Sequence, residues 1–287
     1  MTALLDHRTI RRVVEAALEE DAPFGDLTSQ TLVPADATAT AHLVAREPGV
    51  LAGLEVFEVA MTTLDETAHV ETTLVDGNRF DVGTVLASVT GPARGVLQAE
   101  RVALNLVQRM SGVATLTARY VEQVSGTSAR VVDTRKTTPG LRALERHAVR
   151  CGGGHNHRFS LSDAVMAKDN HLALLGDVEV ALREAAGRLP HTTHVEVEVD
   201  RLDQIEPVLA SGVVGTIMLD NFSLADLRTG VEQVGGRAIV EASGGVSLET
   251  IGDIARTGVD VISVGALTHG VPSLDLGLDV ETVAGEQ

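Results

Sequence analysis

The sequence predicts an α/β protein whose larger part is a parallel α/β barrel with fewer strands than the usual eight. Strand-like and helix-like runs alternate from about residue 129 onward, the order that builds a parallel sheet with short helical crossovers. The last four predicted strand ends recur at spacings of 22, 23 and 22 residues, at Glu198, Asp220, Ser243 and Gly265. Aromatic residues make up only 2 % of the chain, so Val, Leu, Ile and Ala must form the core, which suits buried parallel strands.

The first third of the chain has a mixed pattern, and 287 residues leave room for a smaller domain beside the barrel. A helix is predicted from about Arg8 to Glu20, with Thr9 as its cap and one apolar face formed by Ile10, Val13, Val14, Ala17 and Leu18. Further predicted elements are strands at Thr38–Arg46 and Thr84–Thr90 and a helix at Glu55–Asp65. From Gly95 to about Val124 the pattern is helical, and Gly112 is expected to divide it into two helices.

The repeating part is predicted to contain six or seven strands. Strand-like runs are Ala129–Asp133, Ala164–Ala167, His194–Val199, Gly215–Leu219, Ala238–Ala242 and Val259–Val264. Amphipathic helices are predicted near Asp177–Arg188, Leu202–Ala210, Leu224–Val234 and Leu248–Arg256.

Composition excludes several classes of protein. A formal charge of −17 and the lack of aromatic stacking platforms make nucleic acid an unsuitable partner. Cys151 is the only cysteine, which excludes an intrachain disulfide and a cysteine zinc site. The N-terminal residues 1–8 are charged where a signal peptide has its apolar stretch, and no apolar run is long enough to span a membrane. We therefore expect a cytoplasmic protein without a membrane partner.

Lysine occurs only at Lys136 and Lys168, whereas the other 21 of the 23 basic residues are arginine. Both lysines lie in segments that also contain Arg, Asn, Asp or His. The ammonium group is a compact point charge with a tunable pKa, which the arginine fork cannot reproduce. Chance retention on a solvated face is the alternative, but the two positions together favour a functional role.

In a barrel of this kind the active site forms at the C-terminal ends of the strands. Charged or glycine-rich segments follow six successive predicted strands: Asp133–Lys136, Lys168–His171, Glu196 with Glu198, Asp220–Asn221, Glu241–Gly245 and Val264–His269. One such residue would usually be a solvated loop residue or a helix cap. Six in succession predict a site.

The last two of these segments, Glu241–Ser247 and Val264–His269, predict a phosphate-binding site. Their small residues let backbone N–H groups approach an anion, and the N-terminus of a following helix adds partial positive charge. Phosphate sites at the last two strands recur in this architecture. His269 is either a ligand of the phosphate or a surface loop residue.

The middle of the chain is basic within an acidic protein. From Arg130 to Asp169, eight Arg or Lys residues stand against four carboxylates. We expect a pocket for a small, multiply charged anion, with Arg135, His157, Arg158 and Lys168 as donors. Zinc binding by His155 and His157 is the weaker alternative, because no third ligand is placed nearby in the sequence.

Glu198 and Asp220 end neighbouring predicted strands beside the predicted phosphate site. Carboxylates in such a position bind Mg²⁺ that bridges to a pyrophosphate, or they accept hydrogen bonds from sugar hydroxyls. Buried structural carboxylates bonded to backbone are the alternative. The residues by themselves thus predict a barrel that binds a phosphorylated, sugar-like ligand next to a dianion.

Six motifs in order then give the chain a strong resemblance to a known family: Asp133–Arg142, Gly152–Arg158, Lys168–His171, Glu196–Glu198, Leu219–Phe222 and Ala242–Gly245. With Gly25–Thr28 and Ala99–Asn105 near the N-terminus, they resemble quinolinate phosphoribosyltransferase over essentially the whole chain. The resemblance implies transfer of phosphoribosyl from phosphoribosyl pyrophosphate to quinolinate with loss of CO₂, giving nicotinate mononucleotide and pyrophosphate for NAD synthesis. One departure is His155, which occupies a position where a small or apolar residue is expected, and its role is unassigned.

The resemblance also implies roles for individual residues. Arg101, Arg135, His157, Arg158 and Lys168 would bind the two quinolinate carboxylates. Lys136 would bind phosphates of the sugar donor, Glu198 and Asp220 would face the ribose hydroxyls or Mg²⁺, and Ser243, Gly244, Gly265 and His269 would bind the 5′-phosphate. The groups taken as catalytic are Lys136, Lys168, Glu198 and Asp220, and Mg²⁺ is the implied cofactor.

The family's fold is an N-terminal α/β sandwich domain followed by an incomplete parallel α/β barrel. On this basis we expect the sandwich at residues 1–112, with residues 273–287 packed on it, and the phosphoribosyl-transfer barrel at 113–272. The resemblance further implies a homodimer in which Arg101 completes the site of the partner subunit.

Three alternatives to the quinolinate enzyme follow from the same residues. A sister phosphoribosyltransferase of the same fold could act on another pyridine or a molybdenum-linked substrate. Lys168 at a strand end could be the amine of a Schiff-base lyase. A non-catalytic anion sensor could have kept the pocket.

Overall fold

The computed structural model describes residues 5–281, and the chain forms two compact units. The first unit comprises the chain up to Ala118, Thr137–Gly153 and the residues from Gly270 onward. The second comprises Arg119–Lys136 and Gly154–His269. Expectations for residues 1–4 and 282–287 lie outside the described residues.

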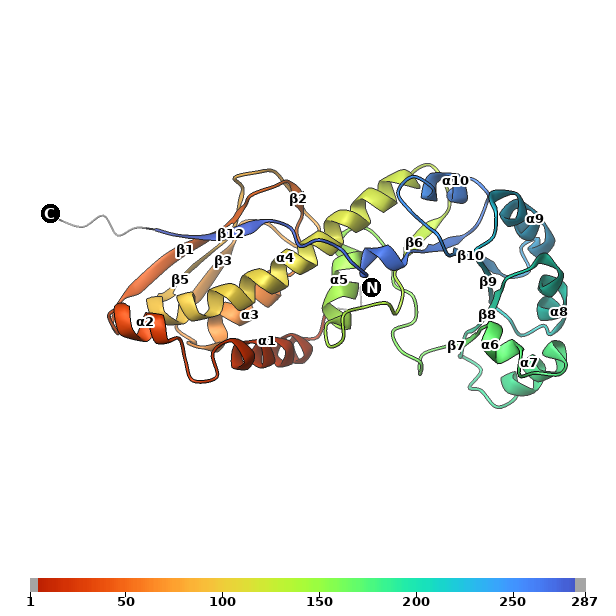
Figure 1. Cartoon of the computed structure of the whole chain (residues 1–287), viewed down its shortest axis with the longest axis horizontal. Helices are drawn as coiled ribbons and strands as arrows, with labels where there is room; N and C mark the ends of the chain where they lie inside the picture. Colours follow the sequence, from red (N-terminus) through yellow and green to blue (C-terminus); the bar gives the residue numbers. More distant parts are fainter. Residues whose placement is uncertain (1–4, 282–287) are drawn as a thin grey trace. The chain divides into compact units, whose positions relative to one another are not determined.

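The first unit is built on an antiparallel sheet of order β12-β1-β5-β3. Its strands are β1 (Thr38–Ala45), β3 (His69–Thr72), β5 (Val85–Pro92) and β12 (Leu276–Val280). A second, two-stranded sheet pairs β2 (Gly49–Val50) with β4 (Arg79–Phe80). Helices of the unit are α1 (His7–Asp21), α2 (Leu27–Leu32), α3 (Leu54–Thr63) and α5 (Arg142–Cys151) (Figure 1). The antiparallel sheet with helices matches the α/β class predicted for the N-terminal region.

Helix α1 has the predicted apolar face, with Ile10, Val14 and Leu18 buried. The predicted cap was wrong. The N-cap is Asp6, and Thr9 lies in the first turn, where its hydroxyl donates to the Asp6 carboxylate at 3.4 Å. The helix therefore begins one residue earlier than its apolar pattern indicates.

Helix α4 (Ala93–Gln123) is one continuous helix of 31 residues, so the predicted division at Gly112 was wrong. A Cβ atom at Gly112 would lie only 2.3 Å from the carbonyl oxygen of Pro272. The glycine thus allows the returning chain to cross the helix closely rather than ending the helix. Burial of Met110 and Val113 on either side offsets the cost of about 1 kcal/mol for glycine in a helix. The domain boundary predicted between residues 112 and 113 falls inside α4.

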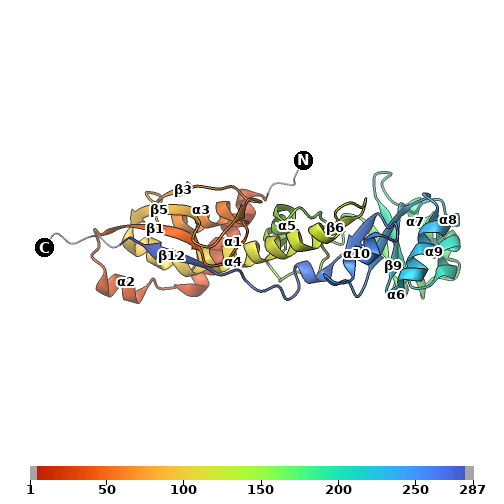
Figure 2. The same cartoon turned by 90° about the horizontal axis from the view of Figure 1, so that it is seen from above.

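The second unit contains a six-stranded sheet of order β6-β11-β10-β9-β8-β7, and all its strand pairs are parallel. This agrees with the predicted incomplete parallel barrel. The strands are β6 (Arg130–Val132), β7 (Val165–Ala167), β8 (Val195–Val199), β9 (Thr216–Asp220), β10 (Ile239–Ser243) and β11 (Val261–Ser263). The helical elements are α6 (Asp169–Leu172), α7 (Val178–Ala186), η1 (Leu202–Gln204), α8 (Ile205–Ala210), α9 (Leu224–Val234), α10 (Ile251–Ala255) and η2 (Gly265–Leu267). Seen from above, α7, α8 and α9 lie along the sheet (Figure 2).

The two faces of this sheet differ in polarity. Ile217, Leu219 and Ile262 are fully buried on the face that the helices cover. Because side chains alternate along a strand, the residues between them point to the other face. The register pairs Glu198 with Met218 and Asp220 with Ser243, which gathers polar side chains at the carboxyl ends of neighbouring strands.

Within residues 5–281, no helix is both long and apolar enough to cross a membrane.

Candidate active site

A cavity of about 810 Å³ opens at the carboxyl ends of the strands of the second unit. Its lining includes every predicted site residue except Arg101: Arg135, Lys136, His157, Arg158, Lys168, Glu198, Asp220, Ser243, Gly244, Gly265 and His269. Arg101 is an exposed residue of α4 in the first unit. Residues separated by more than 130 positions in the sequence therefore share one cavity.

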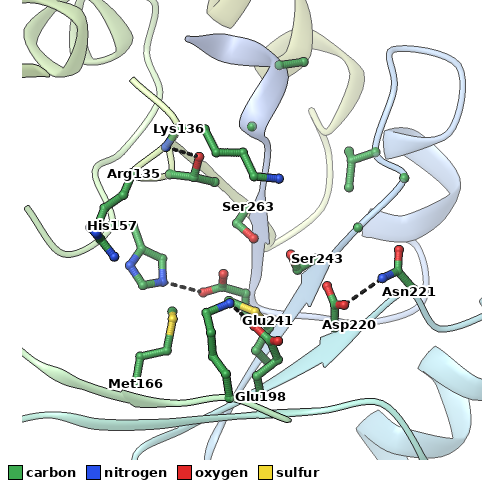
Figure 3. A pocket seen from close by; sticks show the side chains of 18 of the residues that line it. Arg135, Lys136, His157, Met166, Glu198, Asp220, Asn221, Glu241, Ser243 and Ser263 are labelled. Carbon is green, nitrogen blue, oxygen red and sulfur yellow. Dashed lines mark hydrogen bonds and ion pairs between the residues drawn. The ribbon is translucent and has the colours of Figure 1, made fainter. Parts of the chain in front are cut away.

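The cavity also contains residues to which the sequence analysis assigned no role, among them Thr134, Met166, Met218, Asn221, Glu241 and Ser263. Glu241 precedes Ser243 by two residues, Met218 precedes Asp220 by two, and Ser263 precedes Gly265 by two. The period of two along a strand was the signal that could have identified them. Figure 3 shows Arg135 and His157 on one side of the cavity, Asp220 and Asn221 on the other, and Glu241 between them.

The loop after Cys151 is attached to the edge strand β6. His155 donates its backbone N–H to the carbonyl of Val131 at 2.8 Å, and its carbonyl accepts from the N–H of Asp133 at 3.1 Å. The buried carboxylate of Asp133 accepts from the Asn156 amide at 2.5 Å and from the His157 backbone N–H at 2.8 Å. These bonds direct His157 and Arg158 into the cavity.

His157 lies against two carboxylates. Its Nε2 atom is 3.1 Å from Glu196 Oε2 and 3.5 Å from Glu241 Oε2. Burial lowers the pKa of His157, but the hydrogen bonds and charges of the two glutamates outweigh it and raise this pKa to about 10. The backbone N–H of Arg158, 2.7 Å from Nδ1, favours the neutral ring. One peptide dipole is weaker than the combined hydrogen bonds and charges of the two glutamates, so the imidazolium form prevails.

The glutamates themselves are buried, 4 % exposed for Glu196 and 3 % for Glu241. Burial, the largest influence, raises the pKa of Glu196, although the hydrogen bond from His157 acts against it. The Oε1 atoms of both glutamates and the Oγ atom of Ser263 are buried without a hydrogen-bond partner. Buried polar atoms are rarely left in this state except at functional sites. Among the described residues, His157, Glu196 and Glu241 lie close enough together to be ligands of one metal ion. His155 is not part of this group.

Lys168 and Lys136 have different surroundings. Lys168 Nζ forms an ion pair with Glu198 Oε2 at 2.5 Å. The side chain of Lys136 lies against Gly265, where an added Cβ atom would be 3.1 Å from its Cδ. The backbone carbonyl of Lys136 accepts from the Thr268 hydroxyl at 2.7 Å. The segment that holds Lys136 is thus fixed against the turn that follows β11.

The glycine-rich turns lie where they were predicted, after β10 and β11. Gly244 and Gly245 have φ values of +88° and +61°, a conformation that glycine adopts without penalty. The predicted contribution of a following helix was wrong in position, because α10 begins at Ile251 and not at Leu248. Hydrogen bonds between Ser247 and Thr250 form a turn there instead. In the second segment a helical turn, η2, does begin at Gly265.

The predicted pair of carboxylates lies on adjacent strands, since β8 pairs with β9. Asp220 Oδ2 accepts from the Asn221 amide at 2.6 Å. Among the described residues the pair is not part of a group of three or more metal-ligand side chains. This suits Mg²⁺, which usually takes one or two carboxylates together with substrate phosphates and water.

A second cluster, Asp76 with His147 and Cys151, lies in the first unit and is structural. Asp76 accepts from the backbone N–H groups of Gly53 and Leu54 at the start of α3 and lies 2.7 Å from His147 Nε2. Burial raises the pKa of Cys151 to about 12, so its thiol stays protonated and is a poor metal ligand.

Two family models match the chain. The model of the quinolinate phosphoribosyl transferase N-terminal domain matches residues 26–111, and that of the C-terminal domain matches residues 113–279. The chain belongs to the quinolinate phosphoribosyltransferase family.

Relatives of the family resemble the chain over almost its whole length. A nicotinate-nucleotide pyrophosphorylase [carboxylating] of Mycobacterium leprae is 47 % identical, covering 94 % of this chain and 96 % of its own. A probable enzyme of the same name from Bacillus subtilis is 39 % identical, covering 96 % and 95 %. The crystal structure of NadC from Streptococcus pyogenes has a TM-score of 0.92 at 40 % identity, covering 98 % of this chain and 100 % of that one.

The family match confirms the predicted reaction. The protein is a decarboxylating quinolinate phosphoribosyltransferase, a pentosyltransferase that produces nicotinate mononucleotide in NAD biosynthesis. It also decides against the sister-enzyme, lyase and sensor alternatives.

Proposed function

We propose that the cavity of the second unit binds quinolinate and phosphoribosyl pyrophosphate side by side, with the residue roles that the family resemblance implies. The observation that supports this is the composition of one cavity. Its lining has cationic side chains at one side, two glycine-rich turns at the other, and carboxylates at adjoining strand ends (Figure 3). A dianion and a phosphorylated sugar would each meet complementary groups there.

Arg135, His157, Arg158 and Lys168 would bind the two carboxylates of quinolinate. Arg158 is oriented by bonds to the Ala164 carbonyl at 3.0 Å and the Met166 sulfur at 3.5 Å. Burial, the largest influence, lowers the pKa of Arg158, yet a guanidinium remains charged at neutral pH. The bound substrate would then have its ring nitrogen directed toward the sugar donor.

The turns at Ser243–Gly244 and Gly265, with His269, would bind the 5′-phosphate of phosphoribosyl pyrophosphate. Glu198 and Asp220 would face the ribose hydroxyls or hold Mg²⁺, directly or through water, and each carboxylate has a second oxygen beyond the bonds to Lys168 and Asn221. Bound there, Mg²⁺ would neutralise charge on the pyrophosphate leaving group. Lys136 would bind the same phosphates.

In the reaction, the pyridine nitrogen forms a bond to C1 of the ribose while the bond from C1 to the pyrophosphate oxygen breaks. The sugar gains positive charge in the transition state, which nearby carboxylates stabilise. The quaternary ring nitrogen then accepts the electron pair released when the ortho carboxylate leaves as CO₂, and a proton replaces it. No nucleophilic side chain is needed, which agrees with the protonated, half-buried thiol of Cys151.

Release of ¹⁴CO₂ from carboxyl-labelled quinolinate tests this assignment. We expect release only when phosphoribosyl pyrophosphate and Mg²⁺ are both present, with an equal amount of nicotinate mononucleotide formed. Release without the sugar donor, or none from folded protein, would contradict the proposal.

We further propose a homodimer in which Arg101 of each subunit completes the site of the other. Arg101 is exposed and is not among the residues that line the cavity. Mixing an Arg101→Ala subunit with a Lys136→Ala subunit should restore about a quarter of wild-type activity, because half of the dimers would be mixed and each would hold one intact site. Arg119→Ala on the same helix is the control. No recovery on mixing would contradict the shared site.

The cytoplasm remains the proposed compartment, since Cys151 is a free thiol and the sequence offers no disulfide. Fractionation of cells with an antibody to the protein tests it.

A further inference from the structure

The end of strand β9 has an unusual backbone. Asn221 has φ of 58° and is the one non-glycine residue with positive φ among residues 5–281. Glycine would adopt this conformation at no steric cost, whereas other residues strain to reach it and asparagine does so only with some penalty. Asparagine reaches this conformation because its short polar side chain can hydrogen-bond locally.

That side chain contacts Asp220. The Asn221 Nδ2 atom donates to Asp220 Oδ2 at 2.6 Å, so the donor is directed at the carboxylate assigned to the ribose or Mg²⁺. The bond is drawn in Figure 3, where both residues lie on the side of the cavity away from Arg135 and His157.

Asn221 also contacts the neighbouring strand end. Its backbone N–H donates to the carbonyl of Ser243 at 2.9 Å. A Cβ atom added at Gly244 would lie 2.1 Å from Asn221 Oδ1 and 3.0 Å from its backbone nitrogen. The Asn221 amide thus occupies the space between the Asp220 carboxylate and the Gly244 turn, and only glycine fits at position 244.

We propose that Asn221 is a positioning residue for phosphoribosyl pyrophosphate: its amide holds the Asp220 carboxylate and the Ser243–Gly244 turn in fixed relation. The proposal rests on the proposed roles of Asp220 and this turn. Sugar hydroxyls and the 5′-phosphate belong to one molecule, so their two sets of partners must be held at a spacing that this molecule can bridge. The quinolinate side is built on other strands and would not depend on Asn221.

The first test is Asn221→Gly, which preserves the backbone conformation and removes only the amide. Asn78→Gly is the control, because it also removes an asparagine side chain with a local hydrogen bond, here from the Val75 N–H at 3.2 Å, but outside the residues that line the cavity. We expect the KM for phosphoribosyl pyrophosphate to rise about tenfold, the loss of one hydrogen bond to a charged group, while the KM for quinolinate changes less than about twofold. Calorimetric binding of phosphoribosyl pyrophosphate with Mg²⁺, without quinolinate, should weaken by the same factor. The Tm should match that of the control.

A double-mutant cycle tests the contact with Gly244. Gly244→Ala alone should weaken binding of phosphoribosyl pyrophosphate strongly, and adding Asn221→Gly should recover part of the loss because the clash with Oδ1 is removed. Strict additivity, an unchanged affinity in Asn221→Gly, or an equal rise in both KM values would overturn the proposal.

Asp220→Asn separates this inference from the proposed function. If Asp220→Asn weakens binding of phosphoribosyl pyrophosphate and Asn221→Gly does not, only the positioning role fails. If neither has an effect, the assigned role of Asp220 fails as well, and the inference with it.

Discussion

Each unit contains a histidine in contact with a buried or half-buried carboxylate. The two clusters differ in whether every oxygen of the carboxylate has a hydrogen-bond partner. In the first unit, Asp76 accepts from two backbone N–H groups and from His147. Burial raises the pKa of Asp76, but these hydrogen bonds outweigh it and the pKa is lowered. In the second unit, burial raises the pKa of Glu196, and Glu196 and Glu241 each keep an oxygen without a partner.

Hydrogen-bond partners distinguish the carboxylate of Asp76, which accepts from the first residues of α3, from those of Glu196 and Glu241 beside His157. An acid whose oxygens are bonded to backbone stabilises the fold at no cost in unsatisfied atoms. Acids left incomplete cost free energy, and such a cost persists where function requires it. Nδ1 of His147 is the one unpartnered buried atom of the Asp76 cluster among the described residues.

The largest effect is expected from Lys168→Ala. It removes a cation of the cavity and leaves Glu198 without its ion pair. We expect kcat/KM to fall by on the order of a hundredfold or more, about 3 kcal/mol of transition-state binding, with little change in Tm. Arg188→Ala, which removes an exposed helix ion pair with Glu184, is the control. Wild-type turnover in Lys168→Ala would contradict the role of this cavity.

Glu241→Gln should have the next largest effect, and a pH-dependent one. The wild-type pKa of His157 is about 10 against a usual 6.5, so its proton stabilises the folded state fully below pH 6.5, and this contribution is lost as pH rises toward 10. Without the Glu241 charge the pKa of His157 falls, and quinolinate binding should weaken about tenfold more at pH 8.5 than at pH 6. Steady-state kinetics and ¹⁵N spectra of the histidine ring measure both changes. Glu206→Gln, at an exposed ion pair with Arg237, should leave both unchanged.

Asp76→Asn should affect stability and not catalysis. It weakens the cap of α3 and the bond to His147, at a cost of about 1–3 kcal/mol in the free energy of unfolding. Because the pKa of Asp76 is lowered, its contribution is present above about pH 3.8 and is lost as pH falls below that value. Denaturant unfolding at pH 7 and pH 3 measures this. A large fall in kcat with unchanged stability would contradict the structural role of the Asp76 cluster.

A pair of glycines in α4 should give effects on stability alone, of which that of Gly95 is the smallest. Gly112→Ala should cost about 1–3 kcal/mol because the new methyl group meets the Pro272 carbonyl. Gly95→Ala, whose nearest neighbour would be 3.8 Å away, should stabilise the protein by about 0.5–1 kcal/mol. Thermal unfolding of the two variants measures the difference. Equal Tm values would show that the chain is not closely packed over Gly112.

The sequence alone predicted the bounds of those elements whose two ends are both marked by a capping residue. Helix α9 was predicted with its observed bounds, since Ser223 caps it through the Asp226 N–H and Gly235 ends it in the left-handed conformation. Helix α10 was predicted too long, because the Thr250 hydroxyl bonds to the backbone N–H and carbonyl of Ser247 and forms a turn there. Strand β12 was missed, since its pairing with β1 joins residues more than 230 positions apart.

In the site, too, some features could be predicted from the sequence and others could not. Its charged residues stand at strand ends and could be identified from spacing and family motifs. Glu241 and Asn221 were visible at those ends, but their contacts depend on the register of β9 against β10, which the sequence does not specify. The contribution of Arg101 to the site of a partner subunit stays a prediction.

The order of segments along the chain sets the order in which the protein can be completed during synthesis. Strand β1 is made early, yet its partner β12 is the last of the strands within residues 5–281 to leave the ribosome. The edge of β1 that β12 will occupy therefore stays unpaired while the whole second unit is translated, and unpaired edges invite association with other chains. Nascent chains that stop before residue 276 should be the ones most dependent on chaperones.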